Sequence, residues 1–201
     1  NLRFAKNEKD RIENEIEENK KTYNILQKNK NNISGREADI REMILQEIGA
    51  TPAEIPFIGE LIRVKDDEKD WENTIEKILH NFALRLIVPE KYYKEVSQFV
   101  NSNNMNGRIV YQKFTETASL RDFQELPQNC LLTKIEFNPK SKYSKWVEYV
   151  IFNNYNYACV SNLDEFYQIR EKAATIEGLI KSTHNKHEKD DRPHTNSREN
   201  Y

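Results

Sequence analysis

The residues of this chain that are best suited to chemistry gather in one segment, residues 184–194, which reads HNKHEKDDRPH. Imidazoles and carboxylates alternate with basic residues within it, on His184, His187, Glu188, Asp190, Asp191 and His194. These residue types bind metal ions, but their spacing matches neither a zinc finger nor the H-E-x-x-H motif of a helix. A solvated, charged connector explains the same residues without any ligand. We favour the connector and keep a metal-dependent enzyme as an alternative, which would require a stoichiometrically bound metal.

Motifs of nucleotide and nucleophile chemistry do not occur in the sequence. There is no G-x-x-x-x-G-K-[ST] loop, and the five glycines are spread singly, so no glycine-rich loop can cradle a phosphate. No G-x-S-x-G elbow occurs either. Cys130 and Cys159 stand among apolar residues, where a thiol usually packs as a small hydrophobic group. We therefore expect no catalytic residue, no metal and no cofactor in this chain, and neither binding nor hydrolysis of ATP.

Basic and aromatic residues are mixed in one further stretch, which contains Lys134, Lys140, Lys142, Tyr143, Lys145 and Trp146. Such a mixture can contact DNA phosphates and stack on bases. A solvated helix face with a core-facing tryptophan explains the residues equally well, and the formal net charge of -2 does not favour a nucleic-acid binder. We favour the solvated face and retain Lys140, Lys142 and Lys145 as weak candidates for DNA contact.

The composition indicates a protein that is only partly packed into a globule. Hydrophobic residues make up 37% of the 201 residues and charged residues 32%, which is lean for one compact domain. No signal-peptide core and no long apolar run occur, so we expect a cytosolic protein with free thiols and no membrane segment. The chain starts without Met and ends in a polar tract, which suggests an excised fragment.

The elements that must position these residues begin with a heptad pattern in the first 48 residues. Steps of three and four select Leu2, Ala5, Lys9, Ile12, Ile16, Asn19, Tyr23, Leu26, Lys30, Ile33, Glu37, Ile40 and Ile44. This narrow seam predicts one continuous helix over residues 1–47 that lies against a partner helix as a coiled-coil arm. Ser34-Gly35 is the one expected interruption, and Gly49 to Pro52 should end the helix. A surface helix of a bundle is the alternative.

A compact α/β unit follows. We expect strands at residues 59–64, 83–88 and 108–112, joined by two amphipathic helices, with Asn106-Gly107 turning into the third strand. The apolar faces predict a core that consists of Trp71, Ile75, Leu79, Phe82, Leu86, Val88, Phe99 and Val110.

A second unit should follow a connector at residues 115–129. We expect strands at 131–137 and 157–160, a helix that carries Trp146 and Val150, and a helix over residues 163–172 with Asn162 as its N-cap. From Lys181 the chain is polar and has no core-forming spacing, so we expect a loop or an ordered linker there.

Several motifs, in this order, carry a family resemblance: PFIGELIRV, an acidic run, a tryptophan, NFALRLIVPEKYY, GRIVYQ, and later YACVSNLDEF and HEKDDR. Together they resemble the hinge region of SMC-like ATPases over roughly residues 50–201, in particular the MukB/MksB-like subunit of the Wadjet (Jet) plasmid-defence system. The resemblance implies a homodimer through the hinge, a return coiled-coil arm of the same parent chain, and a parent ATPase that extrudes DNA loops and restricts plasmids. It also implies a prokaryotic cytoplasmic protein associated with nucleoid or plasmid DNA.

The expected architecture is therefore α+β: two small α/β lobes, hinge-like, preceded by a long coiled-coil helix. The expected domains are an arm segment at residues 1–48, hinge lobe 1 at 49–118, hinge lobe 2 at 119–180 and a polar connector towards the return arm at 181–201. The fragment itself should mediate protein–protein association. A DNA-binding module of the same machine, with dimerisation secondary, is the alternative, and a salt-dependent shift of DNA would favour it.

Small lobes leave unpaired strand edges, which invite another chain. Our candidate edge on the first lobe consists of Arg108, Ile109, Val110, Tyr111 and Gln112, which contain no proline to block pairing. On the second lobe, the strand at 131–137 and the strand at 157–160 remain equal candidates. The lobes could instead pair with each other inside one chain, which would satisfy the edges without a dimer.

Overall fold

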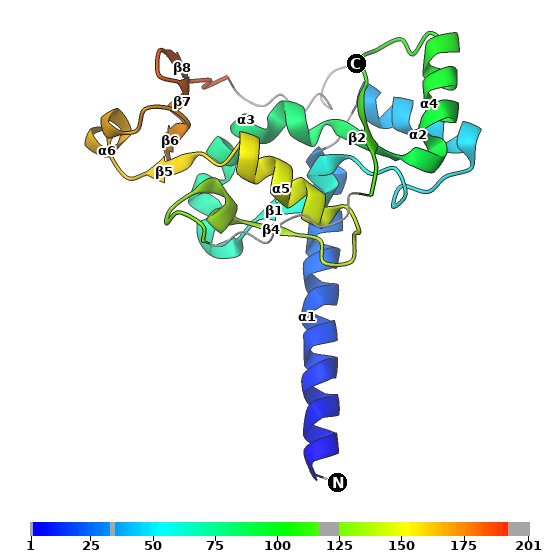
Figure 1. Cartoon of the computed structure of the whole chain (residues 1–201), viewed down its shortest axis with the longest axis horizontal. Coiled ribbons are helices and arrows are strands. Elements are labelled where there is room, and N and C mark those ends of the chain that lie inside the picture. The colour runs from blue at the N-terminus through cyan, green and yellow to red at the C-terminus, as the bar shows by residue number, and fades with distance from the viewer. Residues whose placement is uncertain (1, 33–34, 117–124, 193–201) are drawn as a thin grey trace.

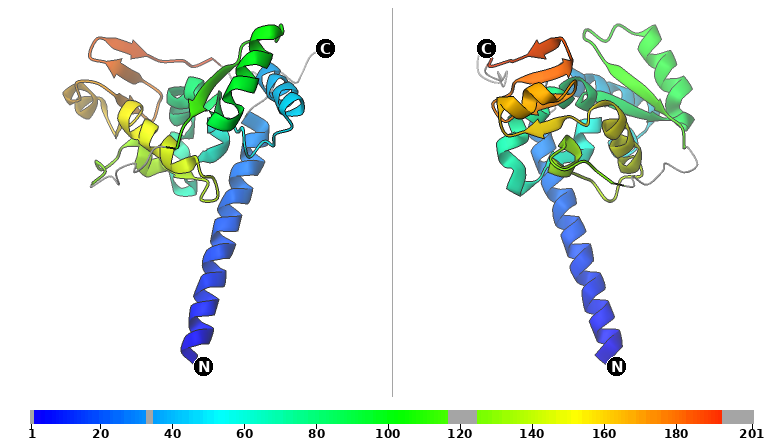
Figure 2. Two further views of the ribbon diagram at one scale, coloured as in Figure 1. Left: turned by 45° about the vertical axis from the view of Figure 1, so that its right-hand side comes forward. Right: turned by 60° about the vertical axis from the view of Figure 1, so that its left-hand side comes forward.

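The computed structural model describes residues 2–32, 35–116 and 125–192. A rod and a body make up the molecule (Figure 1). The rod is α1 (Leu2–Asn32), which at a rise of about 1.5 Å per residue is roughly 45 Å long. Ile12, Ile16 and Tyr23, three members of the heptad seam, are 46%, 47% and 63% exposed. Figure 2 shows the N-terminal part of α1 projecting from the body in both views. The seam at Ile12, Ile16 and Tyr23 is therefore open to a partner.

The predicted continuous helix over residues 1–47 is wrong. A second helix, α2, spans Arg36–Ile48, and Gly35 before it has φ 82° and ψ −145°, which is not helical geometry. Glycine adopts this conformation readily because it lacks a Cβ. Ile40 and Ile44, which the heptad pattern assigned to the coiled-coil seam, are fully buried in the body. The heptad positions Ile12, Ile16 and Tyr23 before Gly35 are thus exposed, whereas Ile40 and Ile44 after it pack in the body.

The body contains helices and short strands in mixed order. They are the 3-10 helix η1 (Ile58–Leu61), β1 (Ile62–Val64), the 3-10 helix η2 (Asp66–Trp71), α3 (Glu72–Ala83), β2 (Arg85–Pro89), α4 (Glu90–Ser102), β3 (Val110–Phe114), the 3-10 helix η3 (Leu131–Lys134), β4 (Ile135–Phe137), α5 (Ser144–Asn154), β5 (Ala158–Val160), α6 (Leu163–Gln168), β6 (Ala173–Thr175), β7 (Ile180–Thr183) and β8 (Lys186–Glu188). The predicted helices of both lobes are present, but the helix predicted over residues 163–172 is shorter and ends at Gln168, because Ile169 is extended. As predicted, the side chain of Asn162 caps α6 by accepting a hydrogen bond from the Glu165 amide at 2.9 Å.

Several strand predictions need correction. Residues 59–64 and 131–137 were expected to be strands, but each begins with a 3-10 turn, and only its last residues pair as β1 and β4. The third predicted strand, at 108–112, lies two residues later as β3. The polar stretch from Lys181 was expected to be a loop or linker, yet its first part forms β7 and β8; residues 193–201 lie outside the described residues.

The strands form three small sheets. β1 pairs antiparallel with β4, so residues 62–64 of the first predicted lobe join residues 135–137 of the second. Arg63 and Glu136 lie opposite each other in this pair and form an ion pair. β2 pairs parallel with β3, and β5 to β8 form a sheet in the order β5-β6-β7-β8. The alternative of pairing between lobes inside one chain is therefore realised for one of the predicted edges.

Two large hydrophobic cores hold the body together, and two smaller clusters pack around β5, β6 and β7. The central core consists of Ile58, Leu61, Ile62, Val64, Ile75, Leu79, Phe82, Ile87, Phe114, Cys130, Leu131, Leu132, Ile135, Tyr143, Val147, Ile151 and Cys159. The α2–α4 core consists of Ile40, Ile44, Leu45, Ile55, Phe57, Leu86, Val88, Val96 and Met105. β2 separates them, because Leu86 and Val88 face one core and Ile87 faces the other, as the alternation of a strand requires. In Figure 1, α2 and α4 lie at one end of the body and β5 to β8 at the other.

The core predicted for the first lobe is correct in part. Ile75, Leu79, Phe82, Leu86 and Val88 are buried as expected. Trp71, Phe99 and Val110, in contrast, are only half-buried, and the buried members are divided between the two cores. The division arises because α3 packs against residues from the second predicted lobe, which no local pattern reveals. The domain boundaries themselves stay predictions.

Candidate functional site

The candidate edge lies at the end of the two-stranded β2–β3 sheet. β3 begins at Val110, and of the predicted edge residues only Val110, Tyr111 and Gln112 belong to it, while Arg108 and Ile109 precede it. All five side chains are exposed or half-buried. β3 has β2 on one side, and in the described part of the chain no strand pairs with its other side. Backbone N–H and C=O groups on this outer side are available to another chain.

Side chains on both faces of β3 fix its position. Tyr111 and Ile109 pack against the α2–α4 core, and the Tyr111 hydroxyl lies 3.0 Å from the Ser97 hydroxyl of α4. Phe114 points to the opposite core, where its ring meets Tyr143 edge-on with the centroids 4.9 Å apart. The faces of the strand are therefore occupied, and its edge is the part that can accept a partner.

The two predicted second-lobe edges differ in how far they are paired inside the chain. β4, at the end of the predicted 131–137 strand, pairs with β1 on one side, and in the described residues no strand pairs with its other side. The outer side of β5 is covered by residues 129–131, because the Leu131 amide donates to Tyr157 O at 2.9 Å and the Cys159 amide donates to Asn129 O at 2.7 Å. Both sides of β5 are therefore paired, whereas β4 keeps one open side in the described residues, and the choice of partner edge stays a prediction. The terminal strand of this sheet is β8, whose side chains are all exposed.

Sequence reasoning missed β8 because its residues carry no apolar alternation. The strand consists only of polar residues, Lys186, His187 and Glu188. The period-two pattern that predicts a strand needs apolar residues on one face. The two-residue turn His184-Asn185 that joins β7 to β8 is the only local hint, since Asn favours tight turns.

The segment at residues 184–194 does not gather its ligand-type side chains. His184 and His187 are exposed on the β7–β8 hairpin, and the His187 ring lies 5.9 Å from the Phe166 ring. In the described residues no group of three His, Cys, Asp or Glu side chains could hold a metal ion, and His194 lies outside them. Nothing in the described geometry supports the metal-dependent enzyme.

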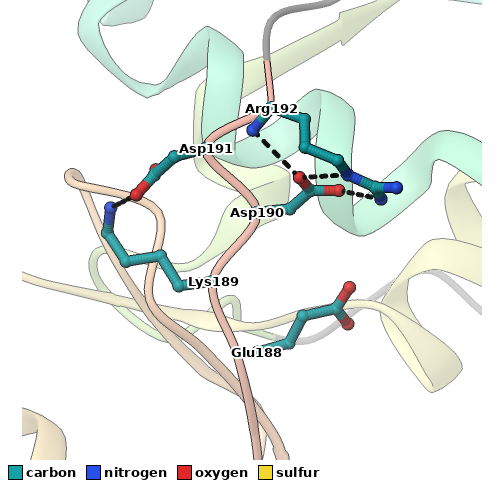
Figure 3. A pocket seen from close by; sticks show the side chains of 5 residues that line it. All are labelled: Glu188, Lys189, Asp190, Asp191 and Arg192. Atoms are coloured by element: carbon teal, nitrogen blue, oxygen red, sulfur yellow. Dashed lines mark hydrogen bonds and ion pairs between the residues drawn. The ribbon is translucent and has the colours of Figure 1, made fainter.

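Close to the hairpin, residues 188–192 line an open hollow (Figure 3). Its aspartates are engaged with basic neighbours: Arg192 donates to Asp190 at 2.8 Å and 2.5 Å, and Lys189 pairs with Asp191. The hydrogen bonds from Arg192 hold the pKa of Asp190 well below its usual range. These pairs satisfy the carboxylates locally, so the hollow offers little unpaired charge to a ligand.

The weak candidates for DNA contact lie before and within the first turn of α5. Lys140 donates a hydrogen bond to Asn19 of α1, and Lys142 lies 3.8 Å from Glu116 and 5.3 Å from the Tyr143 ring centroid. Lys145 is exposed and also interacts within the chain. Lys134, from the same stretch, is buried and pairs with Glu68 at 2.8 Å. Lys140, Lys142 and Lys145 are exposed, and each interacts within the chain, so their contact with DNA stays a prediction.

Comparison with known proteins adds the fold. No protein-family model and no curated protein matches the sequence. Among solved structures, the Pyrococcus furiosus Smc hinge domain with an extended coiled coil aligns with a TM-score of 0.51 and 18% identity, over 92% of this chain and 70% of that one. This is the fold of an SMC hinge.

A second solved structure, the folded elbow of cohesin, aligns with a TM-score of 0.53 and 20% identity over 79% of this chain. The alignment spans only 24% of the cohesin chain. The hinge fold, mixed α+β with a coiled-coil helix, agrees with the predicted architecture.

The two thiols of the body are buried. Cys130 and Cys159 are free thiols in the central core, and burial raises the pKa of Cys159 to about 12. A thiol with so high a pKa is a poor nucleophile at neutral pH. Among the described residues, no helix is long and apolar enough to cross a membrane.

Proposed function

We propose that this chain is the dimerisation hinge of an SMC-like ATPase. The observation that carries the proposal is an SMC-hinge fold whose β3 edge is open while its faces are packed. An exposed edge of this kind pairs readily with a strand from another chain. The chain itself associates proteins, and the chemistry of ATP hydrolysis belongs to other parts of the parent protein.

The edge that receives β3 is β8 of a second copy. Each chain then offers two different edges, and a two-fold axis forms two identical β3–β8 pairs at once, which closes the dimer. Exposed Arg108 before β3 and exposed Glu188 in β8 supply opposite charges to the two edges. In Figure 1, β8 lies at the opposite end of the body from α2 and α4, against which β3 packs; the two edges therefore do not compete for one partner strand.

The family resemblance of the sequence gives the proposal its biological setting. We assign the parent protein to the MukB/MksB-like subunits of the Wadjet plasmid-defence system, which act on DNA by loop extrusion and restrict plasmids in the prokaryotic cytoplasm. The exposed seam of α1 is the surface for the return coiled-coil arm, because Ile12, Ile16 and Tyr23 are open along one face. DNA is a partner of the assembled machine and contacts the hinge only weakly.

Sedimentation of the chain over a wide concentration range tests the proposal. We expect a monomer–dimer equilibrium that persists in an Ile12→Ser, Ile16→Ser variant, which removes association through the arm. Val110→Pro, which deletes a backbone donor of β3, should abolish the dimer while circular dichroism shows that the body is still folded. A chain that stays monomeric at every concentration contradicts the proposal.

A charge exchange sharpens the assignment of the edges. Arg108→Glu and Glu188→Arg should each weaken the dimer, and the double variant should regain affinity, because the opposite charges are restored in exchanged positions. Arg170→Glu, at an exposed position on another loop, is the matched control. Additive weakening in the double variant would contradict the pairing of β3 with β8.

A further inference from the structure

The junction between arm and body contains a contact that the dimerisation hinge does not require. α2 begins at Arg36, directly after Gly35, and packs on α4 and the α2–α4 core through Ile40, Ile44 and Leu45. It continues the chain from the arm into the body, whereas α1 itself contacts the body at η1 and, through Asn19, at Lys140. Whatever α2 contacts at its N-terminal end is in position to sense the arm.

Arg36 contacts the loop that leads into β3. Its Nε donates to the carbonyl oxygens of Met105 at 3.0 Å and Asn106 at 3.1 Å, and its Nη2 donates to Met105 at 2.5 Å. Asp39, one turn later on α2, lies 3.9 Å from the same guanidinium group. A planar guanidinium that bridges two successive carbonyls holds them in a defined geometry, which a lysine cannot reproduce with a single ammonium group.

Gly107 completes the contact from the loop side. A Cβ at this position would lie 2.5 Å from Arg36 Cγ and 3.2 Å from Ile40 Cδ1. Glycine thus permits the close approach of α2, because a Cβ here would force the Arg36 side chain to shift. Three residues later the chain enters β3 at Val110, which pairs with Arg85. The loop has little length in which to absorb a displacement.

We propose that Arg36 and Gly107 form a latch that couples the orientation of the arm to the pairing of the β3 edge. With the latch closed, as in this structure, the start of β3 is held in register for a partner strand. When the arm turns α2 and Arg36 releases the two carbonyls, the loop before β3 loses its anchor and the edge pairs less well. The coupling is reciprocal, so an occupied edge also restricts the arm. This inference rests on the proposed dimerisation.

Two measurements on the full chain test the latch. Sedimentation gives the dimer dissociation constant, and double electron–electron resonance gives the distances between spin labels on Glu17→Cys in α1 and Glu95→Cys in α4; the native cysteines are buried. Labelled chains are diluted with unlabelled chains so that only distances within one chain are seen. We expect Arg36→Ala to raise the dissociation constant at least about fivefold and to broaden the distance distribution. Gly107→Ala should act in the same direction.

The controls separate the latch from a general loss of structure. Arg170→Ala removes an exposed arginine elsewhere and should leave both measurements unchanged. Arg36→Lys keeps the charge but lacks the planar guanidinium that bridges the two carbonyls. Its dimer affinity should therefore lie between those of Arg36→Ala and the unchanged chain. In the unchanged chain, dimerisation should narrow the distance distribution, whereas in Arg36→Ala it should not.

Failure of the latch and failure of the proposed function give different results. If the unchanged chain never dimerises, the proposed function fails. If it dimerises and Arg36→Ala broadens the arm distances without weakening the dimer, the coupling is overturned while the hinge function stands. Unchanged arm distances in Arg36→Ala would also overturn the latch.

Discussion

The two hydrophobic cores of the body differ in how they are built from the chain. The central core joins α3 and β1 to α5 and β4, so residues on both sides of the connector at 115–129 contribute to it. The α2–α4 core is drawn entirely from residues 40–105. One core therefore holds the body together as a unit, and the other attaches α2, the element next to the arm, to one end of it.

Because the two cores are built differently, a cavity in one should affect a different part of the body from a cavity in the other. Loss of packing in the central core affects every sheet that contacts it, because its members come from segments distant in sequence. Loss of packing in the α2–α4 core should first release α2 and α4, because these two helices pack against each other at one end of the body. Local opening of this kind can occur at a lower free energy than global unfolding.

The largest expected effect is in the central core, at Phe82. Its side chain is fully buried, and its ring stacks on Tyr155 with the centroids 4.9 Å apart. Phe82→Ala should lower the free energy of unfolding by about 3–5 kcal/mol, because it leaves a large cavity. Denaturant unfolding followed by tryptophan fluorescence measures the loss, since Trp71 and Trp146 both pack on this core. Asn81→Ala, exposed on the same helix, is the control, and a shift as large as that of Phe82→Ala would contradict this placement.

A smaller and more local effect is expected at Ile44 in the α2–α4 core. The side chain is fully buried, and Ile44→Ala should cost about 2–4 kcal/mol. Amide hydrogen exchange should accelerate in α2 and α4 while α3 and α5 stay protected. Glu47→Ala on the exposed side of α2 should change neither the free energy of unfolding nor the exchange rates of α2 and α4. Equal acceleration in α5 would mean that the two cores unfold as one.

A hydrogen bond joins the central core to the loop that precedes Ile55 of the α2–α4 core, and its removal should lower the stability modestly. The Tyr143 hydroxyl, from the central core, donates to the backbone carbonyl of Glu54 at 2.7 Å, and burial raises the pKa of this tyrosine to about 12. Tyr143→Phe should lower the free energy of unfolding by about 0.5–1.5 kcal/mol, with the ring still packed on Phe114. Thermal unfolding of this variant beside Tyr149→Phe, which alters an exposed tyrosine, measures the difference.

The sequence predicts the helices of the body better than its sheets. The spacing of Ile75, Leu79 and Phe82 marks the buried face of α3, because helix periodicity is local. The pairing of β1 with β4 joins segments about seventy residues apart, and no local sequence pattern in either segment predicts which strand it pairs with. The arm was predicted too long because the heptad spacing continues through Gly35 into Ile40 and Ile44, whose buried partners are in the body.

The site was only partly predictable for a related reason. The β3 edge could be located to within two residues because Val110 and Tyr111 have strand-forming side chains. β7 could not be recognised, because its buried position 181 is a lysine, whose Nζ donates to Phe166 O and Ile169 O, both at 2.7 Å. A buried lysine that binds carbonyl groups at the end of α6 looks, in sequence, like part of a solvated tract.

The smallest expected effect concerns the acid dependence of the joint between the cores, at Glu54. Its carboxylate accepts hydrogen bonds from Lys91 Nζ at 2.8 Å, the Thr51 amide at 3.0 Å and the Tyr92 hydroxyl at 3.0 Å. These bonds, that from Lys91 foremost, lower the pKa of Glu54 from 4.5 to about 2. Because the folded pKa lies below the unfolded one, the stabilisation is complete above pH 4.5 and is lost as the pH falls towards 2.

The titration of Glu60 changes the stability in the opposite direction, so its contribution must be separated from that of Glu54. Burial raises the pKa of Glu60 although it pairs with Arg41, so its protonation favours the folded state as the pH falls. The test is therefore a difference between chains: the destabilisation caused by Glu54→Gln should be constant above pH 5 and shrink as the pH falls below about 4, where the unfolded carboxylate of the unchanged chain takes up its proton. Glu47→Gln, at an exposed position of α2, should show no such trend. A pH-independent effect of Glu54→Gln would mean that the carboxylate does not hold α4 to the loop before β1 through its charge.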